Sequence, residues 1–159
     1  MRLLGSFLRI WARLPSRVRW SGVFAEMGLL WFLSSRTPLV SAATNAGAML
    51  HNAAHVVAYA ALGAMALLAQ TGTRASLPRQ RWVAILMASV YGAVDELHQG
   101  YVPGRVQSLS DFGSDLCGAL CGVLLVQSIR SGEPRWARLA WAALVGGIGC
   151  VTLATFTDW

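Results

Sequence analysis

The feature that most constrains this chain is a series of long apolar stretches that contain no Lys, Arg, Asp or Glu. These stretches cover residues 37–73, 82–94, 116–129 and 139–157, and a fifth, 20–35, is interrupted only by Glu26. A membrane-spanning helix needs roughly 20 mostly apolar residues, so each stretch holds one such helix once its polar ends are included. The predicted spans lie near residues 19–35, 52–71, 82–99, 111–127 and 136–155.

The predicted fold class is an all-α integral membrane protein, a bundle of about five transmembrane helices in a single domain over residues 1–159. Hydrophobic residues make up 55% of the chain and charged residues 13%, as expected for a protein in contact with lipid. Residues 37–73 are too many for one span, so 37–51 is predicted to be either a connecting loop or a short surface helix. Residues 1–15 place apolar side chains at helical spacing, which predicts an interfacial amphipathic helix.

The distribution of arginine predicts how these helices cross the membrane. The chain has 13 arginines and no lysine. Eleven of them fall in the N-terminal segment and in the second and fourth connections, whereas the other side carries only Arg36 and Arg105. Because positively charged connections stay in the cytoplasm, we expect the N-terminus inside and the C-terminus outside, in the cytoplasmic membrane of a bacterium. The arginines form no continuous basic face with interleaved aromatic residues, so nucleic acid is excluded as a partner.

One dense polar cluster interrupts this apolar chain. It begins at the end of the third predicted span and contains Asp95, Glu96, His98, Gln99, Arg105, Ser108, Asp111 and Asp115. An ionisable side chain in the middle of a spanning helix costs at least about 2.5 kcal/mol, so several at one place indicate a site. On a helix Asp95, His98 and Gln99 share one face, while Glu96 is turned about 100 degrees away from it. The arginine count places this cluster at the outer face of the membrane.

The connection after the third span leads from this cluster into the next helix. Pro103 and Gly104 predict a turn, and the turn presents Arg105 back toward the carboxylates. Ser108 or Ser110 is suited to cap the helix that follows, because a serine hydroxyl accepts hydrogen bonds from the first free backbone N–H groups.

The fourth predicted span is expected to pack at the centre of the bundle. Asp111 near its N-terminus is favoured by the helix macrodipole, which is a purely structural reason for its presence. Asp115 lies one turn deeper and should face protein or a wet cavity. Gly118 and Gly122 have the small-xxx-small spacing that lets another helix approach closely.

The second predicted span carries polar groups of its own on one face. His51, His55 and Tyr59 follow one another at i, i+4 steps. The predicted topology puts them at a depth comparable with Asp95 and His98, so they are placed to meet the cluster across the bundle.

These motifs resemble the VanZ-like family of bacterial membrane proteins. The resemblance covers roughly residues 31–122 and rests on His55-x-x-x-Tyr59-x-x-x-Gly63, Asp95-Glu96-x-His98-Gln99-x-Tyr101-x-Pro103-Gly104-Arg105-x-x-Ser108-x-x-Asp111 and Gly118-x-x-x-Gly122. The chain departs from the family pattern at two places, since the family commonly has Asp-Lys at His51-Asn52 and Asn at Asp115. The resemblance implies a small multi-span protein whose founding member is linked to resistance against the glycopeptide teicoplanin.

The polar cluster has one structural and two functional interpretations. As a structural network it fixes the outer end of the bundle, because buried charges must be paired. As a binding site it holds an anionic lipid-linked cell-wall precursor, a glycopeptide or a lipopeptide, through His55, Tyr59, Gln99, Arg105, Ser108, Asp111 and Asp115. As an intramembrane acid–base enzyme acting on a lipid-linked substrate it uses Asp95, Glu96 and His98, or His55 in place of His98. A transporter is less favoured, since the chain shows no inverted repeat.

No cofactor is expected from the sequence. Six residues, His51, His55, Asp95, His98, Asp111 and Asp115, could together supply nitrogen and oxygen ligands for a metal ion. They contain no contiguous signature such as H-E-x-x-H and must converge from three helices, so the pattern does not favour a metal.

Overall fold

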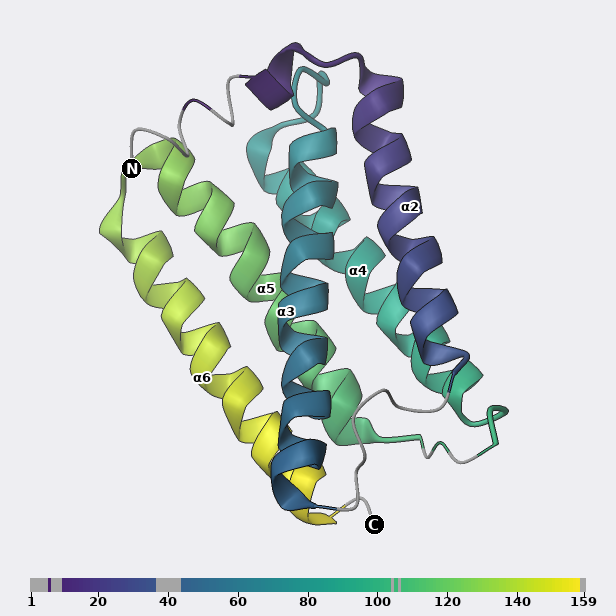
Figure 1. Cartoon of the computed structure of the whole chain (residues 1–159). Coiled ribbons are helices and arrows are strands. Elements are labelled where there is room, and N and C mark those ends of the chain that lie inside the picture. Colours follow the sequence, from purple (N-terminus) through teal and green to yellow (C-terminus); the bar gives the residue numbers. More distant parts are fainter. Residues whose placement is uncertain (1–5, 7–9, 37–43, 104, 106, 158–159) are drawn as a thin grey trace.

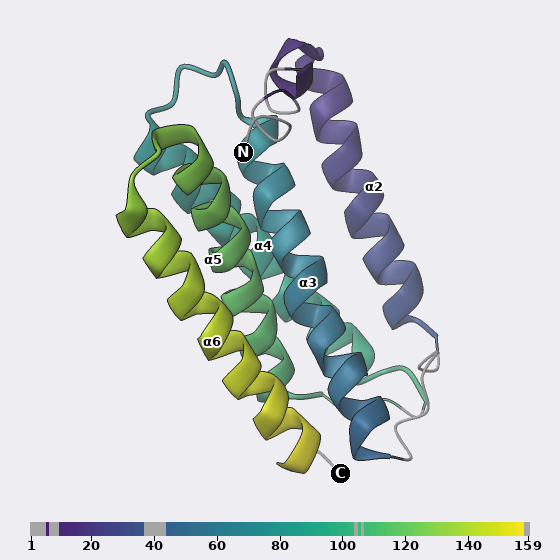
Figure 2. The ribbon, with the colours of Figure 1, turned by 60° about the vertical axis from the view of Figure 1, so that its left-hand side comes forward.

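The helices run alternately up and down along one bundle, as Figures 1 and 2 show from two sides. In this computed structural model the described residues are 6, 10–36, 44–103, 105 and 107–157, and they contain no strand. The helices are α2 Ser16–Ser34, α3 Asn45–Ala69, α4 Leu77–Gln99, α5 Leu109–Ser131 and α6 Pro134–Thr157. Helices α2 and α4 end where α3 and α5 begin, and we call this the site end of the bundle. Of the predicted interfacial helix over residues 1–15, residues 6 and 10–13 are helical, whereas residues 1–5 and 7–9 lie outside the described residues.

Helix α3 begins earlier than the sequence predicts, at Asn45 rather than at residue 52. Thr44 is extended and its Oγ1 accepts a hydrogen bond from the Gly47 N–H at 3.1 Å, which satisfies one of the first free donors of the helix. Residues 45–51 are therefore part of α3, and the prediction of a loop or a separate surface helix over 37–51 is wrong for them. Residues 37–43 lie outside the described part of the chain.

Three of the described helices, α3, α5 and α6, are long and apolar enough to cross a membrane. Helices α2 and α4 carry three and four charged residues and do not join this group. The outward face of α4 is nevertheless apolar, since Leu86, Val90, Val94 and Leu97 are each 45–64% exposed at helical spacing. The described residues thus form a helical bundle with an apolar outer surface, as expected for an integral membrane protein.

Small residues bring α3 and α5 into backbone contact. A Cβ added at Gly118 would lie 2.5 Å from the carbonyl oxygen of Val56, and one added at Gly63 would lie 2.7 Å from that of Ala119. A Cβ at Gly122 would overlap the carbonyl oxygen of Ala60 on α3. The close helix approach predicted from the Gly118 and Gly122 spacing is confirmed, and it fixes the rotation of α5 that turns its carboxylates toward α3 and α4.

Candidate functional site

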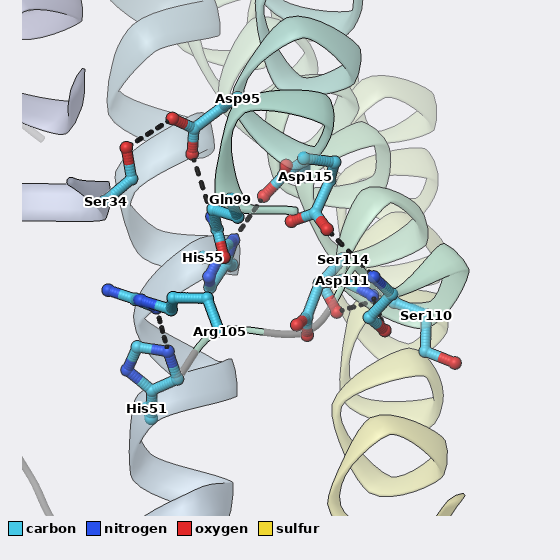
Figure 3. A network of polar contacts seen from close by, with 12 residues as sticks. Ser34, His51, His55, Asp95, Gln99, Arg105, Ser110, Asp111, Ser114 and Asp115 are labelled. Atoms are coloured by element: carbon cyan, nitrogen blue, oxygen red, sulfur yellow. Dashed lines mark hydrogen bonds and ion pairs between the residues drawn. The ribbon is translucent and has the colours of Figure 1, made fainter. Parts of the chain in front are cut away.

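Polar side chains from four helices meet at the site end, as Figure 3 shows from close by. Asp95 lies at the centre of the polar contacts between α2 and α4 and is only 3% exposed. Its Oδ1 accepts a hydrogen bond from the Ser34 hydroxyl at 2.6 Å, and its Oδ2 accepts one from Gln99 Nε2 at 3.1 Å. The carboxylate of Asp95 therefore joins the end of α2 to the end of α4.

The side chain of His98 also turns toward α2, but it lies apart from the carboxylates. Its ring stacks on Trp31 with 3.9 Å between ring centroids, and its Nε2 lies 2.9 Å from the hydroxyl of Ser35. The face predicted to be shared by Asp95, His98 and Gln99 thus exists, because Asp95 and His98 both contact α2 and Gln99 bonds to Asp95. His98 does not line the cavity described below, so the structure leaves it outside the buried polar network.

Replacing Ser34 by alanine should lower the free energy of unfolding by about 1.5–3 kcal/mol, the usual worth of a hydrogen bond to a charged group. The matched control is Ser35→Ala on the next residue, whose bond to His98 is exposed to solvent. Denaturant unfolding of both variants in the same detergent measures the difference. Equal losses of stability would contradict a structural role for the Ser34–Asp95 bond.

On its other side α4 turns Glu96 toward α5. Glu96 Oε2 accepts a hydrogen bond from the backbone N–H of Ser108 at 3.0 Å. The Ser108 hydroxyl in turn accepts one from the Asp111 N–H at 3.0 Å. Of the two serines predicted as possible caps, Ser108 is therefore the one that caps α5. Glu96 Oε1 is buried and has no hydrogen-bond partner among the described residues.

A buried ion pair connects α3 to α5. His55 Nδ1 and Asp115 Oδ1 are 2.9 Å apart, and the side chain of Asp115 is fully buried. Asp115 Oδ2 and the hydroxyl of Tyr59 are also buried and have no partner in the described structure. The expectation that Asp115 faces the protein interior is confirmed, and its immediate partner is a histidine of the second predicted span.

Arg105 does not contact the carboxylates toward which the turn was expected to direct it. Its Nε and Nη2 donate to the carbonyl oxygen of Arg36 at 3.1 and 3.0 Å, and Nη2 also donates to that of Leu33 at 3.3 Å. Its Nη1 lies 2.8 Å from His51 Nε2. Arg105 therefore holds the end of α2 against α3. Burial lowers its pKa, and the nearby carboxylates oppose that shift, so the guanidinium stays charged.

A cavity of about 300 Å³ opens between α2 and α3 at the site end. Its apolar walls are formed by Leu30 and Leu33 of α2 and by Leu50, Ala54 and Ala58 of α3. Five of the predicted site residues line its polar end: His55, Tyr59, Asp95, Gln99 and Arg105. The other carboxylates, on residues 96, 111 and 115, are not part of the lining. The cavity thus combines a hydrocarbon-like wall with a polar end in one volume.

Comparison with known proteins decides the family of this chain. The model of the family described as VanZ/LLP1 matches residues 6–130, which is well over half of the sequence. The chain belongs to the VanZ/LLP1 family. No curated protein and no solved structure matches it. The matched segment contains the whole polar site, whereas α6 lies beyond it.

In this VanZ/LLP1 protein the six possible metal ligands named from the sequence do not gather as one group. His98 stacks on Trp31, and His51 bonds to Arg105. Of the described residues, those with possible metal-binding atoms within 4.8 Å of one another are His55, Glu96 and Asp115. The sequence did not single out this set, because Glu96 was assigned to a separate face of its own helix and the rotation of α4 against α3 was unknown.

Sequence reasoning also missed two contributors to the site of this VanZ/LLP1 protein. Ser34 carries no signal of its own in the sequence beyond its place at the end of the first predicted span, and it bonds to Asp95. Gly92 was not noticed, although a Cβ there would lie 3.0 Å from Asp115 Oδ2 and 3.2 Å from the Tyr59 ring. A glycine on α4 one turn before Asp95 was the available signal, since small residues in membrane helices mark close packing.

Proposed function

We propose that this VanZ/LLP1 protein binds an anionic, acyl-bearing component of the cell envelope in the cavity between α2 and α3. The observation that carries the proposal is the single volume in which an apolar wall leads to a polar end containing Arg105. Such a cavity suits a ligand with a hydrocarbon chain and a phosphate or carboxylate head, as in a lipid-linked cell-wall precursor or a lipid-bearing glycopeptide. Family membership favours teicoplanin as one such ligand and glycopeptide resistance as one consequence.

The orientation that we propose puts this cavity at the outer face of the bacterial cytoplasmic membrane, with five spans and the N-terminus inside. Support comes from the arginines, since among the described residues only Arg36, just after α2, and Arg105, between α4 and α5, lie at the site end. At the opposite end Arg130 donates to the Thr71 hydroxyl at 2.7 Å, and Arg81 lies over the ring of Trp136. Arginines concentrated at that end are expected where the bundle meets the cytoplasm.

Arg105 would attract the anionic head of the ligand mainly through its positive charge, because few of its N–H groups are free to donate. Its bonds to Arg36, Leu33 and His51 use four of the five N–H groups of a guanidinium. The positive charge remains, in a cavity whose apolar walls strengthen electrostatic attraction. A phosphate or carboxylate is therefore held at this end by the field of Arg105 together with the one remaining N–H on Nη1.

The proposal is tested with a substitution that fills the apolar part of the cavity and leaves its polar end unchanged. Ala54→Trp should weaken binding of undecaprenyl phosphate and of teicoplanin at least tenfold, because the indole occupies the space of the acyl chain. Val57→Trp is the matched control, since Val57 is on the same helix, is 71% exposed and does not line the cavity. Native mass spectrometry of the detergent-solubilised protein measures both affinities.

The role of charge is tested with undecaprenol, which has the same chain and no phosphate. We expect at least tenfold weaker binding, since a hydrogen bond to a charged group is worth about 1.5–3 kcal/mol. Equal affinity for the alcohol and the phosphate would contradict recognition of an anion, and equal affinity of the two tryptophan variants would contradict the cavity as the binding place.

A second function is favoured by the polar groups behind the cavity. Glu96 Oε1 is buried without a partner in the described residues, and His55 lies close by. A carboxyl and an imidazole in an apolar setting are the usual means of acid–base catalysis on a bound substrate. An intramembrane enzyme should release product from a lipid-linked substrate, and Glu96→Gln should abolish turnover while leaving affinity unchanged. Binding without product in the wild-type protein would leave the first function alone.

A further inference from the structure

Three buried oxygen atoms near one another have no hydrogen-bond partner among the described residues. They are Glu96 Oε1, Asp115 Oδ2 and the hydroxyl oxygen of Tyr59. The three residues are 6%, 0% and 1% exposed. A buried polar atom without a partner costs about 1–3 kcal/mol, and a charged one costs more, so three such atoms indicate that a further group belongs among them.

The donor atoms around this place are arranged as a ligand set. One nitrogen of His55 and one carboxylate oxygen each of Glu96 and Asp115 lie within 4.8 Å of one another. They come from α3, α4 and α5, and the glycine contacts between α3 and α5 hold two of these helices in fixed positions. The set is therefore built into the packing of the bundle and does not depend on a flexible loop.

The charges point to the kind of group that is missing. With both carboxyl groups ionised, this set carries at least one uncompensated negative charge, because the imidazole can supply only one positive charge; without an ion, burial favours protonated, neutral carboxyl groups. The donors of Arg105 go to the end of α2 and to His51, so its charge acts on these carboxylates only from a distance and without a direct hydrogen bond. A dication beside a neutral imidazole brings the sum to zero, which removes the cost of burying unpaired charge.

We propose that His55, Glu96 and Asp115 bind a divalent transition-metal ion, with zinc as the first candidate, between α3, α4 and α5. Imidazole nitrogen with carboxylate oxygen is a common donor set for zinc, and three protein ligands leave a position open on the ion. The ion would take the place of the His55–Asp115 hydrogen bond. Calcium and magnesium are less suited, because they prefer oxygen donors throughout.

The neighbours of this set are those that a metal centre needs. Gly92 lets α4 approach, because a Cβ there would lie 3.0 Å from Asp115 Oδ2. Tyr59 lies next to His55 with nearly parallel rings and an interplanar angle of 4°, and its hydroxyl is available to an ion or to a bound water. His55 and Tyr59 also line the cavity, so the ion would lie directly behind the polar end that receives the ligand head.

The experiment uses the full chain in detergent, stripped with chelator, incubated with zinc chloride and desalted without any lipid ligand. We expect one zinc per chain by elemental mass spectrometry. Glu96→Gln and Asp115→Asn should each weaken zinc binding at least tenfold in a competition titration with a chelating dye. His98→Asn and Glu26→Gln are the matched controls, a histidine and a carboxylate outside the set, and they should bind zinc as the wild type does.

Cobalt provides a test that needs no variant. X-ray absorption of the cobalt-loaded wild type should show one imidazole and only nitrogen and oxygen donors. A sulfur donor from Cys117, Cys121 or Cys150, no retained ion, or unchanged affinity in both carboxylate variants would each overturn the proposal. Since no amphiphile is present, a failure here is distinct from a failure of lipid binding.

Discussion

Gly122→Ala is expected to lower the free energy of unfolding by up to about 3 kcal/mol. The added Cβ overlaps the carbonyl oxygen of Ala60, which is backbone and cannot rotate away. Relief requires α3 and α5 to separate, and the two helices carry His55 and Asp115 between them. The substitution should therefore weaken the buried ion pair as well as the helix packing.

The matched control for Gly122→Ala is Gly149→Ala on α6. A Cβ at Gly149 meets no atom within 4 Å, so only the gain in helix propensity remains. We expect Gly149→Ala to be neutral or more stable by up to about 1 kcal/mol. Unfolding both variants in the same mixed micelles gives the comparison. A loss of the same size at both positions would show that the α3–α5 contact is looser than the structure indicates.

Leucine at position 55 is expected to lower the free energy of unfolding by about 3–5 kcal/mol. The substitution removes the partner of Asp115 and leaves its carboxylate buried without compensation, and this is the costly way to break a buried pair. The measurement is made after chelator treatment, so that no bound ion contributes. The expected loss is a large fraction of the stability of a typical domain, about 5–15 kcal/mol, so reduced yield of folded protein should accompany it.

The double variant His55→Leu, Asp115→Leu separates the cost of a buried unpaired carboxylate from the effect of losing the shape of the imidazole. Both charges are gone, so we expect it to be more stable than His55→Leu alone. Glu133→Gln is the comparison at the surface, since the Glu133–Arg135 pair has side chains that are 48% and 61% exposed. Its loss should cost no more than about 1 kcal/mol. A double variant as unstable as the single one would mean that His55 acts through its shape and not through its charge.

The helices of this fold could be predicted because their signals are local. Stretches without charge gave the positions of the spans, and the Ser108 hydroxyl marked the start of α5. The boundary of α3 was predicted too late, because Asn45, Gly47 and His51 interrupt the apolar pattern of residues 45–51 and the prediction did not use Thr44 as a cap. Span count and orientation rest on charge distribution and stay predictions.

The site was predictable residue by residue but not as a set of contacts. Helical spacing correctly put Asp95 and Gln99 on one face, because spacing within a helix is fixed by 3.6 residues per turn. The approach of Glu96 to His55 depends on how α4 is rotated against α3, and no local pattern encodes that rotation. The contact of Ser34 with Asp95 is long-range for the same reason.

The bonds by which Arg105 holds the end of α2 also bear on the route by which a ligand reaches the cavity. At the level of Leu30 and Ala58 the two cavity walls are apolar, so a hydrocarbon chain can insert there without breaking a polar bond. Entry past Arg36 from the aqueous side must disturb the bonds of Arg105. For the amphiphilic ligand that we propose, lateral diffusion within the leaflet is then the expected route, and occupancy should follow the mole fraction of the ligand in the bilayer and not its concentration in water.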